Sequence, residues 1–267
     1  MVYTADNAIA DFEEHLHDWP PPVGRVEALE LRKHYGGTTA LDGVSLTFRG
    51  GELCALIGSN GAGKSTFVDA LFATARADGG SVGVDGLDIT RWSSARRACR
   101  GLVRSFQRVR LAGQLTVWEN VALGLLAGDA ALPGWGGPLA QVKGLHEPAV
   151  RALAWVGVAE LADARVAELS FGQRKRVSLA QCLAARPRFL ALDEPVADLD
   201  PGATRVVAKL LAALAAKGIG VLIVEHNLSF AFDTCDRVVV MVSGQITLDG
   251  PAAEVRADPR AVEAQLR

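Results

Sequence analysis

The spacing of hydrophobic residues predicts strands of two kinds. From Val26 onward, hydrophobic and polar residues alternate in "VEALELRKHY" and again in "VSLTFR", which is typical of half-buried antiparallel strands. Farther along the chain, short runs are largely apolar, which is typical of strands buried on both faces of a parallel sheet. These runs occupy residues 53–57, 102–106, 189–192, 221–224 and 238–242. The pattern therefore predicts an α/β fold: a mostly parallel sheet covered by helices, with an antiparallel β subdomain at its edge.

Helical periodicity dominates a long segment between these strands. We expect residues of about 108–185 to form a helical subdomain, interrupted by the Gly- and Pro-rich loop "GDAALPGWGGP". Residues 1–24 contain five acidic residues and no Lys or Arg, and they end in "PPPVG". This composition predicts an acidic N-terminal extension that a stiff proline break joins to the main domain. The main domain, 25–267, is expected to close with a helical tail over about 251–267.

Size and charge exclude several classes of protein. A formal net charge of −2 argues against a dedicated nucleic-acid binder, so no nucleic-acid partner is expected. The four cysteines form no C-x-x-C pair, which disfavours disulfides or a zinc site and fits a reducing compartment. No uncharged apolar run reaches the roughly 18 residues that span a bilayer, and the N-terminus does not look like a signal peptide. We therefore expect a soluble cytoplasmic protein.

One short motif predicts a phosphate-binding loop. The segment "GSNGAGKST" matches the pattern G-x-x-x-x-G-K-[ST], follows a buried run and precedes a helical pattern. Backbone N–H groups of such a loop, together with the helix N-terminus, bind phosphate oxygens. Lys64 is expected to reach the β- and γ-phosphates, and the Ser65 hydroxyl is expected to ligate Mg²⁺. The candidate nucleotide-binding residues here are Gly58, Ser59, Asn60, Gly61, Ala62, Gly63, Lys64, Ser65 and Thr66.

Four further polar residues each follow a buried run. In open α/β sheets, ligands bind beyond the carboxyl ends of the strands, so these side chains should meet near the phosphate loop. Asp193 is expected to hold the Mg²⁺ shell, and Gln107 offers a neutral oxygen to the metal or to water. Glu194 is placed to accept a proton from an attacking water molecule. His226 is placed to hydrogen-bond the γ-phosphate.

The motif "LSFGQ" at residues 169–173 contains no metal ligand and no phosphate loop of its own. Ser170 and Gln173 match a capping box for the following helix, whose N-terminal N–H groups also form an anion site. Together with the phosphate loop and Asp193–Glu194, this motif makes residues 26–267 resemble the ATP-binding cassette (ABC) family. In that family the signature motif faces the nucleotide of a second cassette across a head-to-tail dimer. The resemblance therefore implies a ligand on the partner for Leu169, Ser170, Phe171, Gly172 and Gln173.

The resemblance implies roles for other residues as well. Tyr35 stands where an aromatic residue stacks on adenine, and Gln107 stands where a glutamine links the ATP site to the helical lobe. Asp200 is the aspartate of the dimer-facing loop "VADLD", in which Asp198 replaces the more usual glycine. In the signature, Phe171 likewise replaces a common glycine. The implied cofactors are ATP and Mg²⁺, and the implied reaction is ATP hydrolysis.

Local similarities extend to a branch of the family. The segments "VRSFQRVRLAGQLTVWENV", "LSFGQRKR" and "LDGPAAEVRADPRAVEAQL" are most similar to ATPase subunits of branched-chain amino-acid importers, or of the related urea and amide importers. The implied partners are a second cassette, identical or paralogous, separate transmembrane permeases and, indirectly, an extracytoplasmic solute-binding protein. The implied location is peripheral, on the inner face of the plasma membrane.

Three alternatives fit the sequence less well. Non-transport cassettes of DNA repair or translation usually carry tandem cassettes or a long coiled-coil insertion, and this chain has one cassette without sustained heptads. A P-loop GTPase would need Asn-Lys-x-Asp, which the sequence lacks. The arginines between 91 and 110 could bind a membrane or nucleic acid, but a solvated helix face is favoured. Contact between some of them and a membrane-domain partner stays open.

Overall fold

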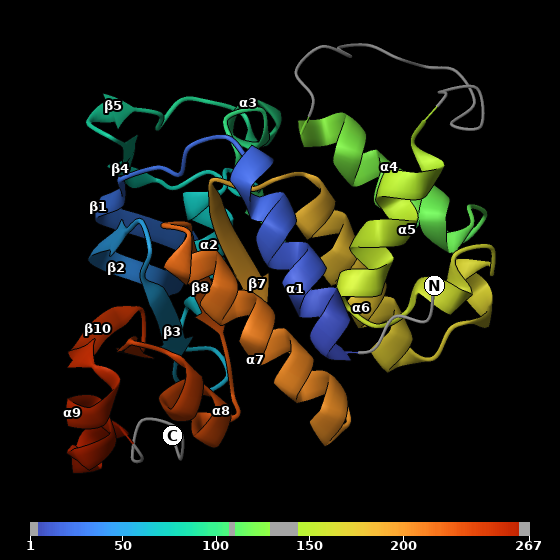
Figure 1. The fold of residues 1–267 in the computed structure, drawn as a ribbon. Helices are drawn as coiled ribbons and strands as arrows, with labels where there is room; N and C mark the ends of the chain where they lie inside the picture. Colours follow the sequence, from blue (N-terminus) through green and yellow to red (C-terminus); the bar gives the residue numbers. More distant parts are fainter. Residues whose placement is uncertain (1–4, 107–109, 129–143, 262–267) are drawn as a thin grey trace.

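A six-stranded sheet forms the centre of the molecule, which we describe from a computed structural model over residues 5–106, 110–128 and 144–261 (Figure 1). The strand order is β10–β9–β3–β8–β7–β6, and every neighbouring pair is parallel except β10 with β9. These strands are β3 (Leu53–Ile57), β6 (Leu102–Arg104), β7 (Phe189–Asp193), β8 (Gly220–Val224), β9 (Arg237–Val242) and β10 (Gln245–Pro251).

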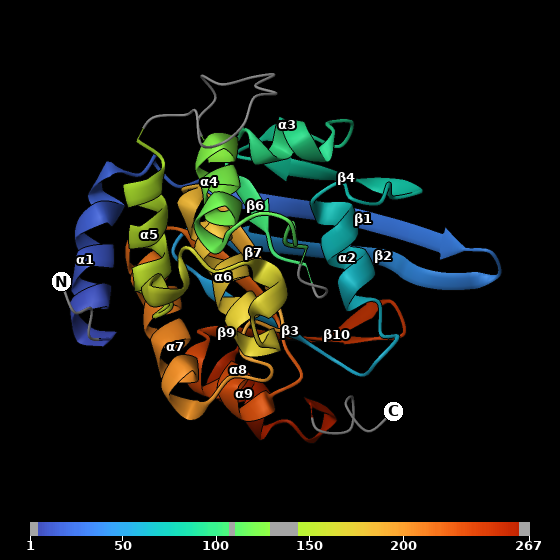
Figure 2. The same cartoon turned by 90° about the vertical axis from the view of Figure 1, so that its right-hand side faces the viewer.

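A second, antiparallel sheet has the order β2–β1–β4–β5. Its strands are β1 (Arg25–Tyr35), β2 (Thr38–Arg49), β4 (Gly79–Val84) and β5 (Leu87–Asp88). The long β1–β2 hairpin extends from one side of the molecule in Figure 2. The predicted combination of a mostly parallel sheet with an antiparallel β subdomain is confirmed.

Helices cover the central sheet and form a lobe beside it. The lobe contains α4, α5 and α6, which pack on one another and stand apart from the β1–β2 hairpin in Figure 2. Among the residues that the structure describes, no helix is long and apolar enough to cross a membrane. The α-helices are α1 (Ala5–His15), α2 (Lys64–Leu71), α3 (Ser94–Ala98), α4 (Val117–Gly128), α5 (His146–Trp155), α6 (Phe171–Ala184), α7 (Pro201–Ala216), α8 (Leu228–Thr234) and α9 (Ala252–Ala257).

Strand β3 divides its side chains between two hydrophobic cores. Leu53, Ala55 and Ile57 face a core shared with α7 and the helical lobe. Cys54 and Leu56 face a second core, formed with α2 and the antiparallel sheet. All five residues are buried because each face of the strand is covered. This arrangement explains why the sequence of the strand is apolar throughout instead of alternating.

The acidic extension folds back over the molecule. In both views α1 lies beside α5 and α7, so it spans the helical lobe and the central domain (Figures 1 and 2). Phe12 is fully buried and meets the rings of Trp19 and Trp155 edge-on, at centroid distances of 5.8 and 5.0 Å. The Trp155 indole Nε1 donates to Asp11 Oδ2 at 2.7 Å. The sequence predicts an acidic extension but gives no sign of this apolar docking.

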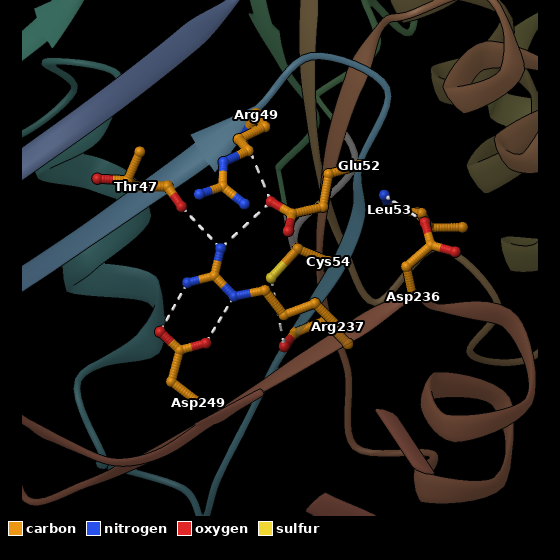
Figure 3. Close-up of polar contacts among 9 residues, drawn as sticks. Thr47, Arg49, Glu52, Leu53, Cys54, Asp236, Arg237 and Asp249 are labelled. Atoms are coloured by element: carbon orange, nitrogen blue, oxygen red, sulfur yellow. Dashed lines mark hydrogen bonds and ion pairs between the residues drawn. The ribbon is translucent and has the colours of Figure 1, made fainter. Parts of the chain in front are cut away.

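A polar network ties the two sheets together at the amino ends of the parallel strands (Figure 3). Arg237 is its centre, and its guanidinium pairs with both carboxylate oxygens of Asp249, at 2.5 and 2.6 Å. The same guanidinium donates to the Thr47 carbonyl at 2.7 Å and to Glu52 at 3.2 Å. The phosphate loop follows the opposite end of β3, so this network is structural and stands apart from the candidate site.

Two arginines depart from the predicted solvated helix face. Arg97 is only 2% exposed, and its guanidinium donates to the carbonyls of Ala70 and Leu71 at the end of α2. Arg104 pairs with Asp69 of the same helix at 2.6 Å. For these two residues the prediction is wrong, because their charges satisfy groups of α2 instead of water.

Candidate functional site

The phosphate loop joins β3 to α2, as predicted, and its backbone depends on glycine. Gly63 caps α2 with φ +105°, and a Cβ at this position would lie 2.4 Å from the Ala40 carbonyl oxygen. A Cβ on Gly58 would lie 2.2 Å from the Met241 carbonyl oxygen. Both distances are shorter than any real contact of a Cβ atom, so only glycine fits where the loop passes this close to the neighbouring backbone.

Lys64 lies inside the loop. Its ammonium donates to the carbonyl oxygens of Gly58 at 2.7 Å and Ser59 at 2.9 Å, and the residue is only 6% exposed. Burial lowers the pKa of Lys64, while the nearby carboxylates of Asp193 and Glu194 act against this shift. A buried ammonium beside the N-terminus of a helix is an arrangement that attracts an anion.

Two carboxylates follow β7 at the same edge of the sheet. Asp193 ends the strand and is buried, and its backbone N–H donates to the Ser105 hydroxyl at 2.9 Å. Burial raises the pKa of Asp193 to about 6, and the adjacent Glu194 adds to the effect. A cation bound between these groups would stabilise the ionised carboxylate. The environment of Asp193 therefore fits a metal ligand.

Glu194 adopts a left-handed backbone conformation with φ +49°, and its N–H donates to the Val224 carbonyl of β8 at 2.8 Å. His226, just beyond β8, places Nε2 at 3.6 Å from Glu194 Oε1. Burial lowers the pKa of His226, and the Lys64 charge lowers it further. This shift, which the Glu194 carboxylate opposes, favours the neutral imidazole, and that form can donate one hydrogen bond and accept another.

These groups line one cavity of about 380 Å³. Its walls combine the loop with both carboxylates and the histidine: Asn60, Gly61, Ala62, Gly63, Lys64, Ser65, Thr66, Asp193, Glu194 and His226. Val224 of β8 and the segment Thr38, Thr39 and Ala40 also line it, and sequence reasoning missed the three residues of this segment. The only available signal was their position after the Gly36–Gly37 turn, next to Tyr35.

Of the predicted nucleotide-binding residues, Tyr35, Gly58 and Ser59 do not line this cavity. Tyr35 is half exposed on the β1–β2 hairpin, with the Lys33 ammonium 5.3 Å from its ring centre. Gly58 and Ser59 contribute instead through their carbonyls, which hold Lys64. Gln107 lies outside the described residues.

The signature motif lines a different groove, of about 600 Å³, with Arg176 and the loop around Asp200. The predicted capping box is confirmed: Ser170 Oγ accepts from the Gln173 N–H at 3.3 Å, and Gln173 Oε1 accepts from the Ser170 N–H at 2.8 Å. Phe171 is half exposed, whereas Leu169 is buried. No carboxylate of the phosphate-loop cavity lines this groove.

The dimer-facing loop predicted from the sequence borders the same groove. Asp200 caps α7, and its Oδ1 accepts from the N–H groups of Gly202 and Ala203 at 2.8 and 2.9 Å. Asp198 has φ +61°, a conformation that glycine adopts most easily. The substitution of aspartate for the more usual glycine therefore keeps a left-handed backbone at this position. A Cβ on Gly172 would lie 3.0 Å from the Asp198 carbonyl oxygen, so the loop and the signature motif are closely packed.

Comparison with known proteins places these motifs in one family. A family model described as "ABC transporter" matches residues 41–197. The methionine import ATP-binding protein MetN of Rhizobium johnstonii is 38% identical over 88% of this chain, and the match covers 63% of that protein. The chain thus spans somewhat less than two thirds of the length of this relative. A probable branched-chain amino acid transport ATP-binding protein, LivG of Methanocaldococcus jannaschii, is 34% identical over 86% of this chain and 93% of its own length.

A solved structure agrees with both the sequence relatives and the fold. An ATP-binding cassette of an ABC transporter in its ADP conformation aligns with a TM-score of 0.78 and 31% identity. The alignment covers 92% of this chain and 98% of the solved one. The predicted cassette fold is thereby confirmed.

Proposed function

Since this chain belongs to the ABC transporter family, we propose that it binds and hydrolyses ATP and thereby powers an importer. One observation carries the proposal. A buried lysine in a phosphate loop, a metal-type aspartate and a second carboxylate share one cavity of about 380 Å³. These are the groups that phosphoryl transfer to water needs, because catalysis there consists of positioning and charge stabilisation.

The phosphate loop holds the nucleotide in this proposal. The Lys64 ammonium, now bonded to two loop carbonyls, would exchange one of them for β- and γ-phosphate oxygens. Backbone N–H groups of residues 60–66 would surround the remaining oxygens. Ser65 and Asp193 would hold Mg²⁺, and Gln107 is the third candidate ligand. When bound, Mg²⁺ neutralises charge that develops on the phosphates.

Glu194 is the proposed general base. Its carboxylate would take the proton of the attacking water while that water forms a bond to the γ-phosphorus, and ADP would leave with the electrons of the broken P–O bond. His226, 3.6 Å from this carboxylate, would hold the γ-phosphate by a hydrogen bond. Tyr35 is proposed to stack on adenine, as its place beside the cavity wall at Thr38 allows.

A second cassette completes each site in this proposal. Ser170, Phe171, Gly172 and Gln173 line a groove that shares no lining residue with the cavity of the chain's own phosphate loop, so their ligand would be the partner's ATP. Leu169 anchors the motif in the lobe. Asp200 would meet the partner from the neighbouring loop. The partner is either an identical chain or a paralogue.

We propose an amino acid as the imported solute. Relatives named for methionine import and for branched-chain amino acid transport match at similar identity, so both solute classes are candidates. A urea or amide importer is the alternative, and a non-transport cassette is less favoured. The further partners are separate permeases and, indirectly, an extracytoplasmic solute-binding protein, which would place the chain on the inner face of the plasma membrane.

Two measurements test this function. Purified protein should release phosphate from ATP in the presence of Mg²⁺ and lose this activity when Mg²⁺ is chelated. Cells that lack the chain should take up labelled leucine or methionine more slowly, with labelled urea as the comparison. Absence of Mg²⁺-dependent hydrolysis at any protein concentration would contradict the enzymatic part, and unchanged uptake of both amino acids would contradict the solute class.

A further inference from the structure

Lys175 connects the signature helix to the catalytic edge of the same chain. It lies in the first turns of α6, two residues after Gln173. Its ammonium donates to the Glu194 carbonyl oxygen at 2.9 Å and lies 5.3 Å from the centre of the Phe171 ring. Burial lowers the pKa of Lys175, and the carboxylates of Glu194 and Asp198 lead the opposing effects.

The peptide groups on both sides of Glu194 are held in place. On one side, its N–H donates to Val224 of β8 at 2.8 Å. On the other side, its carbonyl accepts the hydrogen bond from Lys175. Between them, Glu194 has φ +49°, a conformation that is unfavourable for a residue with a side chain. Such a conformation persists only where surrounding contacts enforce it. Lys175 is therefore one of the contacts that set the direction of the Glu194 side chain.

The two neighbouring basic residues of α6 have a different role. Arg174 donates to the Ala167 carbonyl at 3.1 Å, and Arg176 donates to the Gly157 carbonyl at 3.0 Å. Both contacts stay within the helical lobe. Lys175, by contrast, donates its hydrogen bond to the loop after β7. The sequence "RKR" alone does not distinguish them.

We propose that Lys175 is a positioning residue that ties the Glu194 backbone of its own ATP site to the helix whose N-terminus binds the partner's ATP. The proposal rests on the proposed function. A movement of α6 when Ser170 meets the partner's nucleotide would reach Glu194 through this hydrogen bond. Hydrolysis at one site thus depends on engagement at the other.

Replacement of Lys175 by methionine tests the link, because methionine keeps the length and apolar stem but removes the donor. Misplacement of a catalytic group by about 1 Å costs on the order of 100-fold, so we expect kcat for ATP to fall at least about 10-fold in Lys175→Met. The KM for ATP and the ATP affinity of the monomer should change by less than about threefold, because the phosphate loop is untouched. Lys175→Arg, which keeps a donor, should restore part of kcat.

Arg174→Met is the matched control, since it removes a neighbouring charge and a carbonyl contact on the same helix. Its kcat should stay within about twofold of the parent. A second readout is the double variant with Glu194→Gln. If Lys175 acts through Glu194, then Lys175→Met should cause no further loss in that background, a non-additivity that a purely structural role would not produce. Thermal melting verifies that each variant is folded, and Lys175→Leu, which also lacks a donor, replaces the methionine variant if that one unfolds.

Each result has one meaning. A folded Lys175→Met with kcat near that of the parent overturns the proposal, as does an equal loss in Arg174→Met. Additive losses with Glu194→Gln overturn it too. Normal hydrolysis by Glu194→Gln would overturn the assignment of the base and this proposal together. Loss of activity in Glu194→Gln alone would overturn only the role of Lys175.

Discussion

The N-termini of α2 and α6 both begin with a Gly-containing polar motif, yet they are equipped differently. At α2, the cap is a glycine in a left-handed conformation, without a side-chain hydrogen bond, and Lys64 fills the space between loop and helix. At α6, the Ser170 side chain caps the helix. The first helix start shares a cavity with Asp193, Glu194 and His226, whereas the second opens on a different groove, lined by Arg176, Asp198 and Asp200.

This difference indicates that the N-termini of α2 and α6 have different roles. In the proposed function, the groups at the α2 end would hold the phosphates and activate water, so this end should bind nucleotide without the partner. The α6 end offers a hydroxyl and backbone N–H groups, but neither Lys64 nor Glu194 lines its groove. In the proposed function it would therefore complete a site held by another chain. In the interpretation proposed here, each chain contributes one end of each kind to a pair of composite sites.

The largest expected effect comes from the base on the α2 side. Glu194→Gln should keep ATP binding and lose hydrolysis by roughly 10²–10⁴-fold, the usual contribution of a general base. Phosphate release under saturating ATP measures the rate, and calorimetry with the variant verifies binding. A rate within about threefold of that of the parent would show that Glu194 is not the general base.

A smaller effect is expected from the phosphate loop. Lys64→Ala removes charge-assisted hydrogen bonds worth about 1.5–3 kcal/mol each, so ATP affinity should fall at least about tenfold. Lys217→Ala provides the control, because this lysine contacts His17 and lies outside the cavity. Calorimetric titration of both variants gives the affinities. Equal affinity of Lys64→Ala and the parent would show that α2 does not bind the phosphates.

A third effect concerns stability and distinguishes Asp193, beside the phosphate loop, from Asp200, which caps α7. Asp193 has a folded pKa of about 6, above its usual value of 3.8, so its ionisation favours the unfolded chain. This cost develops as pH rises from about 4 to 6 and then stays constant at up to about 3 kcal/mol. Asp193→Asn should therefore raise the free energy of unfolding above pH 6, in metal-free buffer, and change little below pH 4.

Asp200 should respond with the opposite sign. Hydrogen bonds from the N–H of Ala203 and from that of Gly202 lower its pKa, so its ionised form stabilises the start of α7. Asp200→Ala should lower the melting temperature at neutral pH. Melting curves of both variants between pH 4 and 8 make the test. The same sign of change for both aspartates would contradict the assignment of one to a ligand site and the other to a helix cap.

The sequence predicts the parts of this molecule that depend on local pattern. The phosphate loop is predictable because glycine spacing, Lys64 and Ser65 are all contiguous. The strands β3, β7 and β8 are predictable because both of their faces are buried, which makes the runs apolar. The run at 102–106 is only partly a strand, since β6 ends at Arg104 and Ser105 instead accepts a hydrogen bond from the Asp193 N–H.

Contacts between distant segments could not be predicted in the same way. Lys175 and Glu194 are joined only by the packing of α6 against the end of β7, and nothing in "RKR" marks the middle residue. The docking of α1 on α5 depends on Phe12 and Trp155, which are far apart in sequence. Arg97 was expected on a solvated face, yet it is buried because the carbonyls at the end of α2 need a donor.

The central claim is that the α6 end acts on a nucleotide held by another chain, and the most direct test is ATP-dependent dimerisation of Ser170→Arg. The variant is made in the Glu194→Gln background, so that bound ATP is not consumed, and sedimentation velocity gives the size. Glu194→Gln alone should dimerise with ATP. We expect Ser170→Arg to bind ATP as a monomer with near-parental affinity but not to dimerise, because the arginine would occupy the space for the γ-phosphate. A folded Ser170→Arg that dimerises on ATP, and that hydrolyses it normally when Glu194 is present, would show that the motif only caps a helix.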